Sequence, residues 1–168
     1  MFRKLAASLA TALVAAASVA LPAAPAQAEP VRAGTGDGPV VFTRSTGLGM
    51  QDVITCTGTS DNPHNSSGTP SAVTGKSRSS CTAPVAEIRA QAELWRYLEG
   101  YGFVQTAIGS LAAAPNSAGP MPSTAFDICQ GRLAYWVTVG RHTFYAPPGY
   151  SPPKITLVTE TPPVGVNC

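Results

Sequence analysis

Cysteine is the residue type of this chain whose chemistry is clearest. Cys56, Cys81, Cys129 and Cys168 are separated by 24, 47 and 38 residues. A zinc site uses close pairs such as C-x-x-C with histidines nearby, so these spacings do not favour a metal. An even number of cysteines in an exported chain predicts two disulfides. We favour the neighbouring pairs, Cys56–Cys81 and Cys129–Cys168, and keep the immunoglobulin-type pair Cys81–Cys129 as the second possibility.

The two histidines, His64 and His142, are the candidate general bases. A Ser-His-Asp set could use either of them, but no serine stands in the G-x-S-x-G frame of a nucleophile elbow. His64 follows Pro63 in a polar segment, and His142 follows Gly140-Arg141, a pair that marks a turn or a bulge. We therefore interpret both as imidazoles on surface loops. The sequence predicts no catalytic residue and no cofactor.

Two carboxylates facing each other across a groove would indicate a glycosidase. Glu87 and Glu93 are the candidates because acidic residues are few. They would share one face of a strand, but would lie about 240° apart around a helix. The pattern is too common to favour a hydrolase over a protein without enzymatic activity.

The first 28 residues have the three parts of a secretory signal peptide. MFRK gives the positive start, residues 5–21 form an apolar run, and AQA at 26–28 supplies the small residues of a cleavage site. The run is slightly short for a bilayer core, which needs about 20 residues. We expect cleavage after Ala28 and a secreted, extracellular mature protein.

Removal of the signal peptide changes the charge of the chain. Two of its 11 basic residues, and none of its 9 acidic residues, lie in the first 28 positions. The mature chain would therefore be formally neutral. Without a basic block, neither nucleic acid nor an anionic membrane surface is a favoured partner, which leaves an unknown extracellular protein or glycan.

Composition divides the mature chain into two parts. Residues 29–50 are rich in Gly, Thr and Pro, which predicts a flexible N-terminal extension with at most a short edge strand at 40–44. Residues 51–168 contain strand-like runs at intervals of about ten residues, separated by Gly and Pro. This pattern predicts an all-β fold: a disulfide-bonded β-sandwich of about seven strands, immunoglobulin-like in architecture.

Residues 85–98, VAEIRAQAELWRYL, fit two kinds of secondary structure. Their Ala, Glu, Gln and Leu content favours a helix, which Gly100 would end. As a strand, they would alternate between a polar face and an apolar face. The apolar face of that strand would consist of Ile88, Ala90, Ala92 and Leu94.

The antibody fold offers a test for this region. Trp95 follows Cys81 by 14 positions, close to the spacing of the core tryptophan in antibody domains. Asp127, however, stands where those domains have a tyrosine before the second cysteine. The strict immunoglobulin pattern is therefore only partly met.

Further along the chain, residues 103–112 are interpreted as a strand and residues 113–124, with three prolines, as a loop. In the strand that follows, the adjacent Tyr135 and Trp136 must point to opposite faces. An outward aromatic side chain can stack on a sugar or form a protein interface, unless a loop covers it.

The stretch APPGYSPP, residues 146–153, contains two proline pairs around Gly149 and Tyr150. Proline fixes its own φ near −65° and extends the residue before it. The stretch therefore predicts a stiff connector between two strands. We expect the Tyr150 ring to pack under the connector, with its hydroxyl at the surface.

Three motifs appear in order along the chain: Asn62-Pro63-His64, then CTAPV at 81–85, then PPGYSPP at 147–153. Together with the four cysteines, they resemble a family of small secreted actinobacterial proteins of unassigned function. The resemblance implies a secreted, disulfide-bonded, β-rich domain and transfers no catalytic residue. It also favours a strand over 85–98, although the helix stays open.

Three functions remain for such a chain. The first is a non-enzymatic extracellular binding or structural module with an unknown ligand. The second is a secreted protease inhibitor, which would need a rigid exposed loop, and residues 57–70 or 113–124 could supply one. The third is a small extracellular hydrolase.

Overall fold

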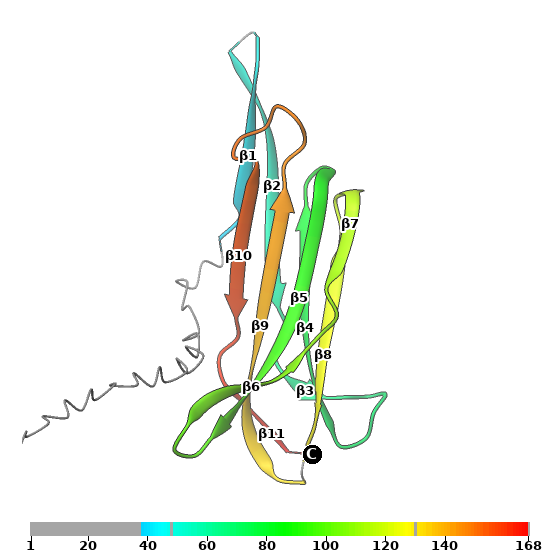
Figure 1. Ribbon diagram of the computed structural model, residues 1–168, viewed down its shortest axis with the longest axis vertical. Helices are drawn as coiled ribbons and strands as arrows, with labels where there is room; N and C mark the ends of the chain where they lie inside the picture. Colours follow the sequence, from blue (N-terminus) through cyan, green and yellow to red (C-terminus); the bar gives the residue numbers. More distant parts are fainter. Residues whose placement is uncertain (1–37, 48, 130, 168) are drawn as a thin grey trace, which may run out of the picture. The chain divides into compact units, whose positions relative to one another are not determined.

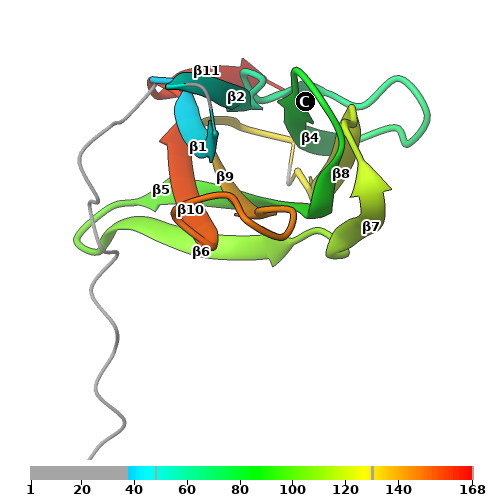
Figure 2. The ribbon, with the colours of Figure 1, turned by 90° about the horizontal axis from the view of Figure 1, so that it is seen from above.

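The computed structural model describes residues 38–47, 49–129 and 131–167. The predicted signal peptide (1–28) and residues 29–37 of the predicted extension lie outside this part. The described residues form eleven β-strands and no helix. The strands make two antiparallel sheets that pack face to face (Figure 1, Figure 2). The predicted all-β sandwich, immunoglobulin-like in its two packed sheets, is confirmed, with more strands than the seven or so expected.

Sheet A has five strands in the order β1-β2-β4-β3, and β8 pairs with the opposite edge of β4. Each pairing is antiparallel. The strands are β1 (Val40–Thr46), β2 (Met50–Ser60), β3 (His64–Asn65), β4 (Ala72–Cys81) and β8 (Met121–Ile128).

Sheet B has six strands around a central pair, β5 and β9. Two strands pair with successive parts of β5, and two others with successive parts of β9. The strands are β5 (Val85–Leu98), β6 (Gly102–Ile108), β7 (Ala112–Ser117), β9 (Leu133–Tyr145), β10 (Lys154–Glu160) and β11 (Val164–Asn167).

The short edge strand expected at 40–44 is present as β1 and continues to Thr46. It pairs with β2 from Val40 opposite Cys56 to Thr46 opposite Met50. Residues 40–46 therefore belong to sheet A.

The alternative of a helix over 85–98 is wrong, and the strand is confirmed. β5 has a paired neighbour on each side, so tertiary pairing overrides the helix-forming composition. Gly100 does not end a helix. It lies in the β5–β6 turn with φ +80°, and Tyr101 N–H donates to Leu98 O across that turn at 3.0 Å. The inward side chains of β5 are the predicted ones: Ile88, Ala90, Ala92 and Leu94.

Two loop interpretations from the sequence are wrong. Residues 113–124 lie mostly in β7 and β8. Pro115 lies in β7, which pairs with β5 as an edge strand, the place in a sheet where proline is tolerated. The Gly140-Arg141 pair marks neither a turn nor a bulge, because β9 continues through it from Leu133 to Tyr145 and keeps its register with β5 and β10.

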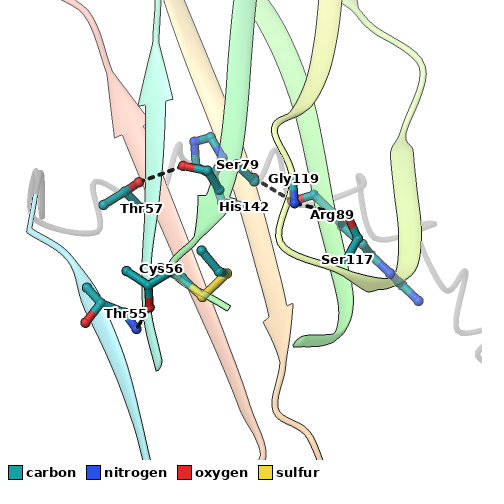
Figure 3. The surroundings of a disulfide bond; sticks show 11 residues. Thr55, Cys56, Thr57, Ser79, Arg89, Ser117, Gly119 and His142 are labelled. Carbon is teal, nitrogen blue, oxygen red and sulfur yellow. Dashed lines mark hydrogen bonds between the residues drawn. A yellow bond between two sulfur atoms is a disulfide. The ribbon is translucent and has the colours of Figure 1, made fainter. Parts of the chain in front are cut away.

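The disulfide Cys56–Cys81 is confirmed (Figure 3). It joins directly opposed residues of β2 and β4 within sheet A, so the immunoglobulin-type pair Cys81–Cys129 is wrong. Cys129 also takes part in a disulfide, but its predicted partner, Cys168, lies outside the described residues and that pairing stays a prediction. The fully buried tryptophan is Trp136 rather than the half-buried Trp95.

The space between the sheets contains two apolar clusters with polar residues between them. The first cluster gathers around Phe42, Ile88 and Phe144, and the second around Leu94 and Trp136. Strand β9 passes from the second apolar cluster to the first. Its inward residues are Trp136 in the second cluster, then Thr138, Gly140 and His142, and then Phe144 in the first cluster.

The APPGYSPP connector between β9 and β10 is confirmed as a structural joint. Tyr150 N–H donates to Pro147 O at 3.2 Å, and Gly149 has φ +85°, as the third residue of a type II turn requires. Beyond the turn, Ser151 exchanges two backbone hydrogen bonds with Thr43, at 2.9 and 2.8 Å. The connector therefore fastens sheet B to the edge strand β1 of sheet A.

Candidate functional site

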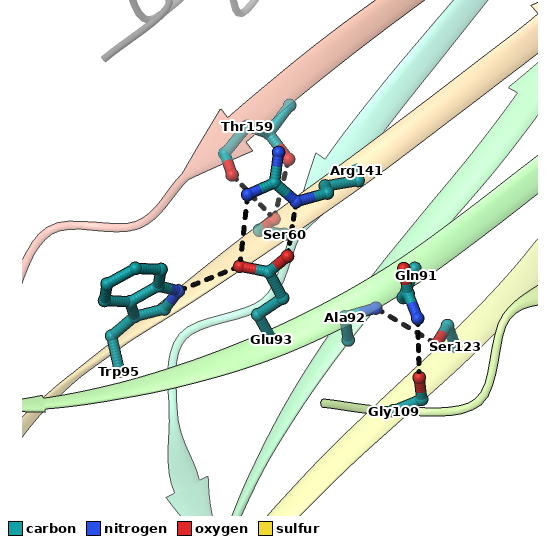
Figure 4. Close-up of polar contacts among 9 residues, drawn as sticks. All are labelled: Ser60, Gln91, Ala92, Glu93, Trp95, Gly109, Ser123, Arg141 and Thr159. Atoms are coloured by element: carbon teal, nitrogen blue, oxygen red, sulfur yellow. Dashed lines mark hydrogen bonds and ion pairs between the residues drawn. The ribbon is translucent and has the colours of Figure 1, made fainter. Parts of the chain in front are cut away.

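His142 lies at the centre of the polar residues that separate the two apolar clusters, and its exposed fraction is 0%. Its Nδ1 lies 2.8 Å from Ser79 Oγ, and its Nε2 lies 2.9 Å from Thr159 Oγ1. Thr159 Oγ1 in turn lies 2.6 Å from Ser60 Oγ. We call these four residues, Ser60, Ser79, His142 and Thr159, the polar band (Figure 3, Figure 4).

The hydrogen bonds of the polar band run in one direction. Ser79 Oγ donates to Arg89 O at 2.8 Å, because a carbonyl oxygen only accepts. Ser79 must then accept from His142 Nδ1–H, which leaves His142 Nε2 to accept from the Thr159 hydroxyl. Ser60 completes the chain by donating to Thr159 Oγ1. The three hydroxyls and the imidazole N–H of the polar band therefore all donate to acceptors within the protein.

Two glycines make room for the imidazole of His142. A Cβ at Gly58 would lie 2.3 Å from His142 Cδ2, and one at Gly140 would lie 2.7 Å from His142 Nε2. The close approach of this ring is the reason that position 140 requires a glycine. Burial lowers the pKa of His142 to about 4, because desolvation disfavours the charged imidazolium.

The polar band has the residue types of a nucleophile–base pair but not the arrangement. Ser79 and His142 are both fully buried, so no substrate can reach them. The Ser79 proton is committed to a backbone carbonyl, and an imidazole with a pKa of about 4 is a weak base near neutral pH. The interpretation of His142 as a surface imidazole is wrong, since partner residues remote in sequence enclose it.

Glu87 and Glu93 do share one face of β5, but they do not form a catalytic pair. Six residues of strand separate them by about 20 Å, beyond the spacing of glycosidase carboxylates. Arg89 Nε donates to Glu87 at 2.9 Å, and this hydrogen bond lowers the pKa of Glu87. Glu93 is 3% exposed, pairs with Arg141 and accepts from Trp95 Nε1 at 3.0 Å (Figure 4).

His64, the other predicted loop imidazole, is exposed in the short strand β3. Its Nδ1 donates to Asn62 O at 3.0 Å. Within the described part of the chain, no three His, Cys, Asp or Glu side chains gather as metal ligands would. Nor do those residues include a helix long and apolar enough to cross a membrane.

A cleft with exposed aromatic residues lies where β5 turns into β6, beside the start of β9. Its volume is about 490 Å³, within the usual range of ligand sites. The alternation of β9 is as predicted: Trp136 points inward, while Tyr135 points out and is 53% exposed. We call this site the aromatic cleft. Its lining residues are Arg96, Tyr97, Leu98, Glu99, Arg132, Leu133, Ala134 and Tyr135.

Apolar side chains continue from the aromatic cleft onto the β5–β6 hairpin. Tyr97 and Phe103 face each other across the hairpin in an edge-to-face contact, with ring centroids 5.5 Å apart. Leu98 and Val104 lie on its other face and are also exposed, and Tyr101 projects from the turn. The hairpin thus exposes apolar side chains on both faces, which is unusual for a surface element without a partner.

The charged side of the aromatic cleft has hydrogen-bond donors without acceptors. The Arg96 guanidinium lies 5.5 Å from the centre of the Trp136 ring. Arg96 Nε, which belongs to the cleft, and Trp136 Nε1, which lies behind it in the second apolar cluster, are buried and make no hydrogen bond in the described part of the protein. The same is true of the buried Ser77 Oγ and Thr138 Oγ1. Buried donors of this kind are rare and need an explanation. The strand pattern of β5 and β9 predicts the outward aromatics, but it does not reveal these donors.

A polar cluster holds the APPGYSPP connector in place. The Tyr150 hydroxyl donates to Asp52, whose carboxylate also accepts from Arg44 at 2.7 Å, and the Arg44 guanidinium lies 4.7 Å from the Tyr150 ring centre. The hydrogen bond from Tyr150 lowers the pKa of Asp52 and raises that of Tyr150. The ring packs against the first apolar cluster, as expected, but its hydroxyl is bonded to the β1–β2 hairpin.

No family model, curated protein or solved structure matches this chain. The resemblance to small secreted actinobacterial proteins therefore stays a prediction. Function has to be inferred from the geometry of the sites themselves.

Proposed function

We propose that this chain is exported and acts outside the cell as a non-enzymatic binding module, which takes a protein partner in the aromatic cleft. The observation that carries the proposal is the group of exposed aromatic residues, Tyr97, Tyr101, Phe103 and Tyr135, around a cleft of about 490 Å³. Buried aromatic residues commonly dominate binding energy at protein interfaces.

Export is supported by two features. The predicted signal peptide at 1–28 would direct the chain across a membrane. The Cys56–Cys81 disulfide is a bond that persists in oxidising compartments and is rare in the cytosol. The proposed actinobacterial source rests on the motif resemblance alone.

A protein partner fits the aromatic cleft better than a flat sugar chain. Tyr97 and Phe103 meet at an interplanar angle of 67°, so they do not form a level surface on which successive sugars could stack. The exposed apolar residues on both faces of the β5–β6 hairpin suit a partner that encloses the hairpin. Two arginines, Arg96 and Arg132, line the cleft against one acidic residue, Glu99, so they would face an acidic or carbonyl group of that partner.

The alternative functions have less support. Two segments are the candidates for the loop of a protease inhibitor. Residues 113–124 lie mainly in β7 and β8, so they do not form a loop. Residues 57–70 end in an exposed loop, residues 66–71. A hydrolase would need an accessible nucleophile or acid–base pair, and the polar band is enclosed. Backbone hydrogen bonds from Ser66 to Ala72 and from Cys129 to Ser71 hold the ends of the loop at 66–71, so the protease inhibitor is the second candidate, whereas no accessible contact among the described residues favours the hydrolase.

The experiment is affinity capture from the secreting culture with the mature protein and a Tyr97→Ser/Tyr135→Ser variant. The partner, identified by mass spectrometry and purified, should bind the unchanged protein with a Kd that the double variant weakens at least tenfold. Val53→Ser is the matched control, because Val53 is also an exposed apolar strand residue but lies away from the aromatic cleft. Equal binding by the double variant would reject the cleft. Saturable turnover of a substrate, lost on one substitution, would reject the non-enzymatic proposal.

A further inference from the structure

A second pocket lies on the outer face of sheet A, where β3, β4 and β8 meet. It has a volume of about 200 Å³ and does not share a residue with the aromatic cleft. Most of its lining side chains carry a hydroxyl, so we call it the hydroxyl pocket. The lining residues that matter for recognition are His64, Ser66, Thr69, Lys76, Thr124 and Phe126.

Strand register places these side chains together. Thr74 of β4 is paired with His64 on one side and with Phe126 on the other, and Lys76 is paired with Thr124. Gly75, between them, faces the interior, since a Cβ there would lie 2.8 Å from Leu94 Cδ2. Alternation along β4 therefore turns Thr74 and Lys76 outward, and Thr74 forms the floor of the pocket.

The charge of the hydroxyl pocket is positive. Lys76 makes no ion pair with any of the described residues. Neither Asp nor Glu belongs to the lining within the described chain, and the nearby Asp61 is paired with Arg78 at 2.6 Å. The Lys76 ammonium thus has its charge available for an anionic group of a ligand.

The neutral groups of the pocket suit a polyhydroxylated ligand. His64 Nδ1 carries the proton that it donates to Asn62 O, so a neutral His64 offers Nε2 as an acceptor. Hydroxyl side chains such as Thr124 can both donate and accept. Phe126 adds an aromatic ring that is 62% exposed, against which the apolar face of a sugar ring can stack.

The loop between β3 and β4, residues 66–71, lines the pocket and is held at both ends by backbone hydrogen bonds. Ser66 N–H donates to Ala72 O at 2.8 Å, and Cys129 N–H donates to Ser71 O at 2.7 Å. Inside the loop, Thr69 N–H donates to Ser66 Oγ at 3.1 Å. A loop fixed in this way loses little conformational entropy when a ligand binds.

We propose that the hydroxyl pocket binds one unit of an acidic saccharide. The acidic group pairs with Lys76, the ring stacks on Phe126, and the sugar hydroxyls bond to His64 Nε2 and to the surrounding hydroxyls. The pocket is smaller than sites for drug-sized molecules, which suits a single ring rather than a long oligomer. This site is separate from the aromatic cleft and does not depend on the partner proposed there.

The test is isothermal titration of the mature protein with three probes: a hexamer of galacturonic acid, maltohexaose and inorganic phosphate. We expect the acidic hexamer to bind at least tenfold more tightly than the neutral one, and more tightly than phosphate. Lys76→Met and Phe126→Ser should each weaken the acidic hexamer at least tenfold. The matched controls are Lys154→Met, on another strand, and Ile128→Ser, an exposed apolar residue of β8 that does not line the pocket.

The possible results are distinguishable. Equal affinity for the two hexamers would overturn the assignment of an acidic ligand, and phosphate binding as tightly as the hexamer would show an anion site without sugar recognition. Normal binding by Lys76→Met would overturn the site itself. Since both substituted side chains point to the outer face, far-ultraviolet circular dichroism of each variant should match the unchanged protein, which excludes misfolding as the cause of lost binding.

Discussion

The polar band and the aromatic cleft place chemical groups in opposite settings. The polar band encloses an imidazole and three hydroxyls between the sheets, and its hydrogen bonds form a continuous chain. The aromatic cleft exposes tyrosine rings and leaves Arg96 Nε without an acceptor among the described residues. Residue types that resemble a catalytic site are here buried between the sheets, whereas residue types typical of a core are exposed at the surface. Four predictions test this contrast, from the largest effect to the smallest.

Gly58→Ala should be the most damaging of the small substitutions. The new Cβ would lie 2.3 Å from His142 Cδ2, and hydrogen bonds on both ring nitrogens keep the imidazole from turning away. We expect the free energy of unfolding, measured by urea denaturation, to fall by about 3 kcal/mol. Gly68→Ala is the control, because no atom lies within 4 Å of its Cβ position. A similar loss in both variants would contradict a tightly enclosed imidazole.

Acidification should destabilise the protein through His142. Its pKa is about 4 in the folded state against the ordinary histidine value of 6.5, so the unfolded chain binds the proton first. The stabilisation is complete above pH 6.5 and is lost as the pH falls from 6.5 towards 4, by about 3 kcal/mol in all.

A His64→Gln background leaves His142 as the single imidazole of the chain. In this background, urea denaturation should give a free energy of unfolding about 2.5 kcal/mol lower at pH 4.5 than at pH 7.5, beyond the change seen in a variant that also carries His142→Gln. An imidazole that titrates near pH 6.5 in the folded protein, observed by nuclear magnetic resonance, would show that the polar band is open to water.

Tyr150→Phe should have a moderate effect, because Tyr150 is half buried and lies outside both sites. The substitution removes the hydrogen bond to Asp52 but keeps the ring that packs on the first apolar cluster. We expect the melting temperature to fall by about 3 °C, by differential scanning calorimetry, with partner binding retained. Tyr101→Phe, at the exposed hairpin turn, is the control. An unchanged melting temperature with lost binding would make Tyr150 a recognition residue.

Tyr135→Ser should change stability least. Its side chain is largely in solvent, so the free energy of unfolding should change by no more than about 0.5 kcal/mol in urea denaturation. Binding of the proposed protein partner should nevertheless weaken. A large loss of stability would instead show that the aromatic cleft belongs to the folded core, and the contrast with the polar band would disappear.

The sequence predicts those parts of the fold that depend on local alternation. The inward face of β5, the opposite directions of Tyr135 and Trp136, and the Cys56–Cys81 pair all follow from spacing along the chain. Turn chemistry likewise predicts the PPGY joint. These features depend on one strand or turn, or, for the disulfide, on residues 25 positions apart in the chain.

The polar band could not be predicted in the same way. Ser60 and Thr159 are 99 positions apart, and Ser79 and His142 are 63 apart. Serine, threonine and glycine in such strands indicate solvent exposure when each strand is considered alone. Their burial follows from partners that only the packing of the two sheets brings together. The same limitation applies to the hydroxyl pocket, whose lining comes from three strands and a loop.

The contact between Thr43 and Ser151 has a consequence for solubility. β1 is an edge of sheet A, and an unpaired edge can add a strand from another molecule and begin aggregation. Ser151 occupies the N–H and C=O of Thr43, and the adjacent Pro152 and Pro153 have no N–H to offer a further strand. The proline-rich connector therefore covers the edge of β1 at Thr43 and interrupts the row of free backbone groups that a strand from another molecule would need.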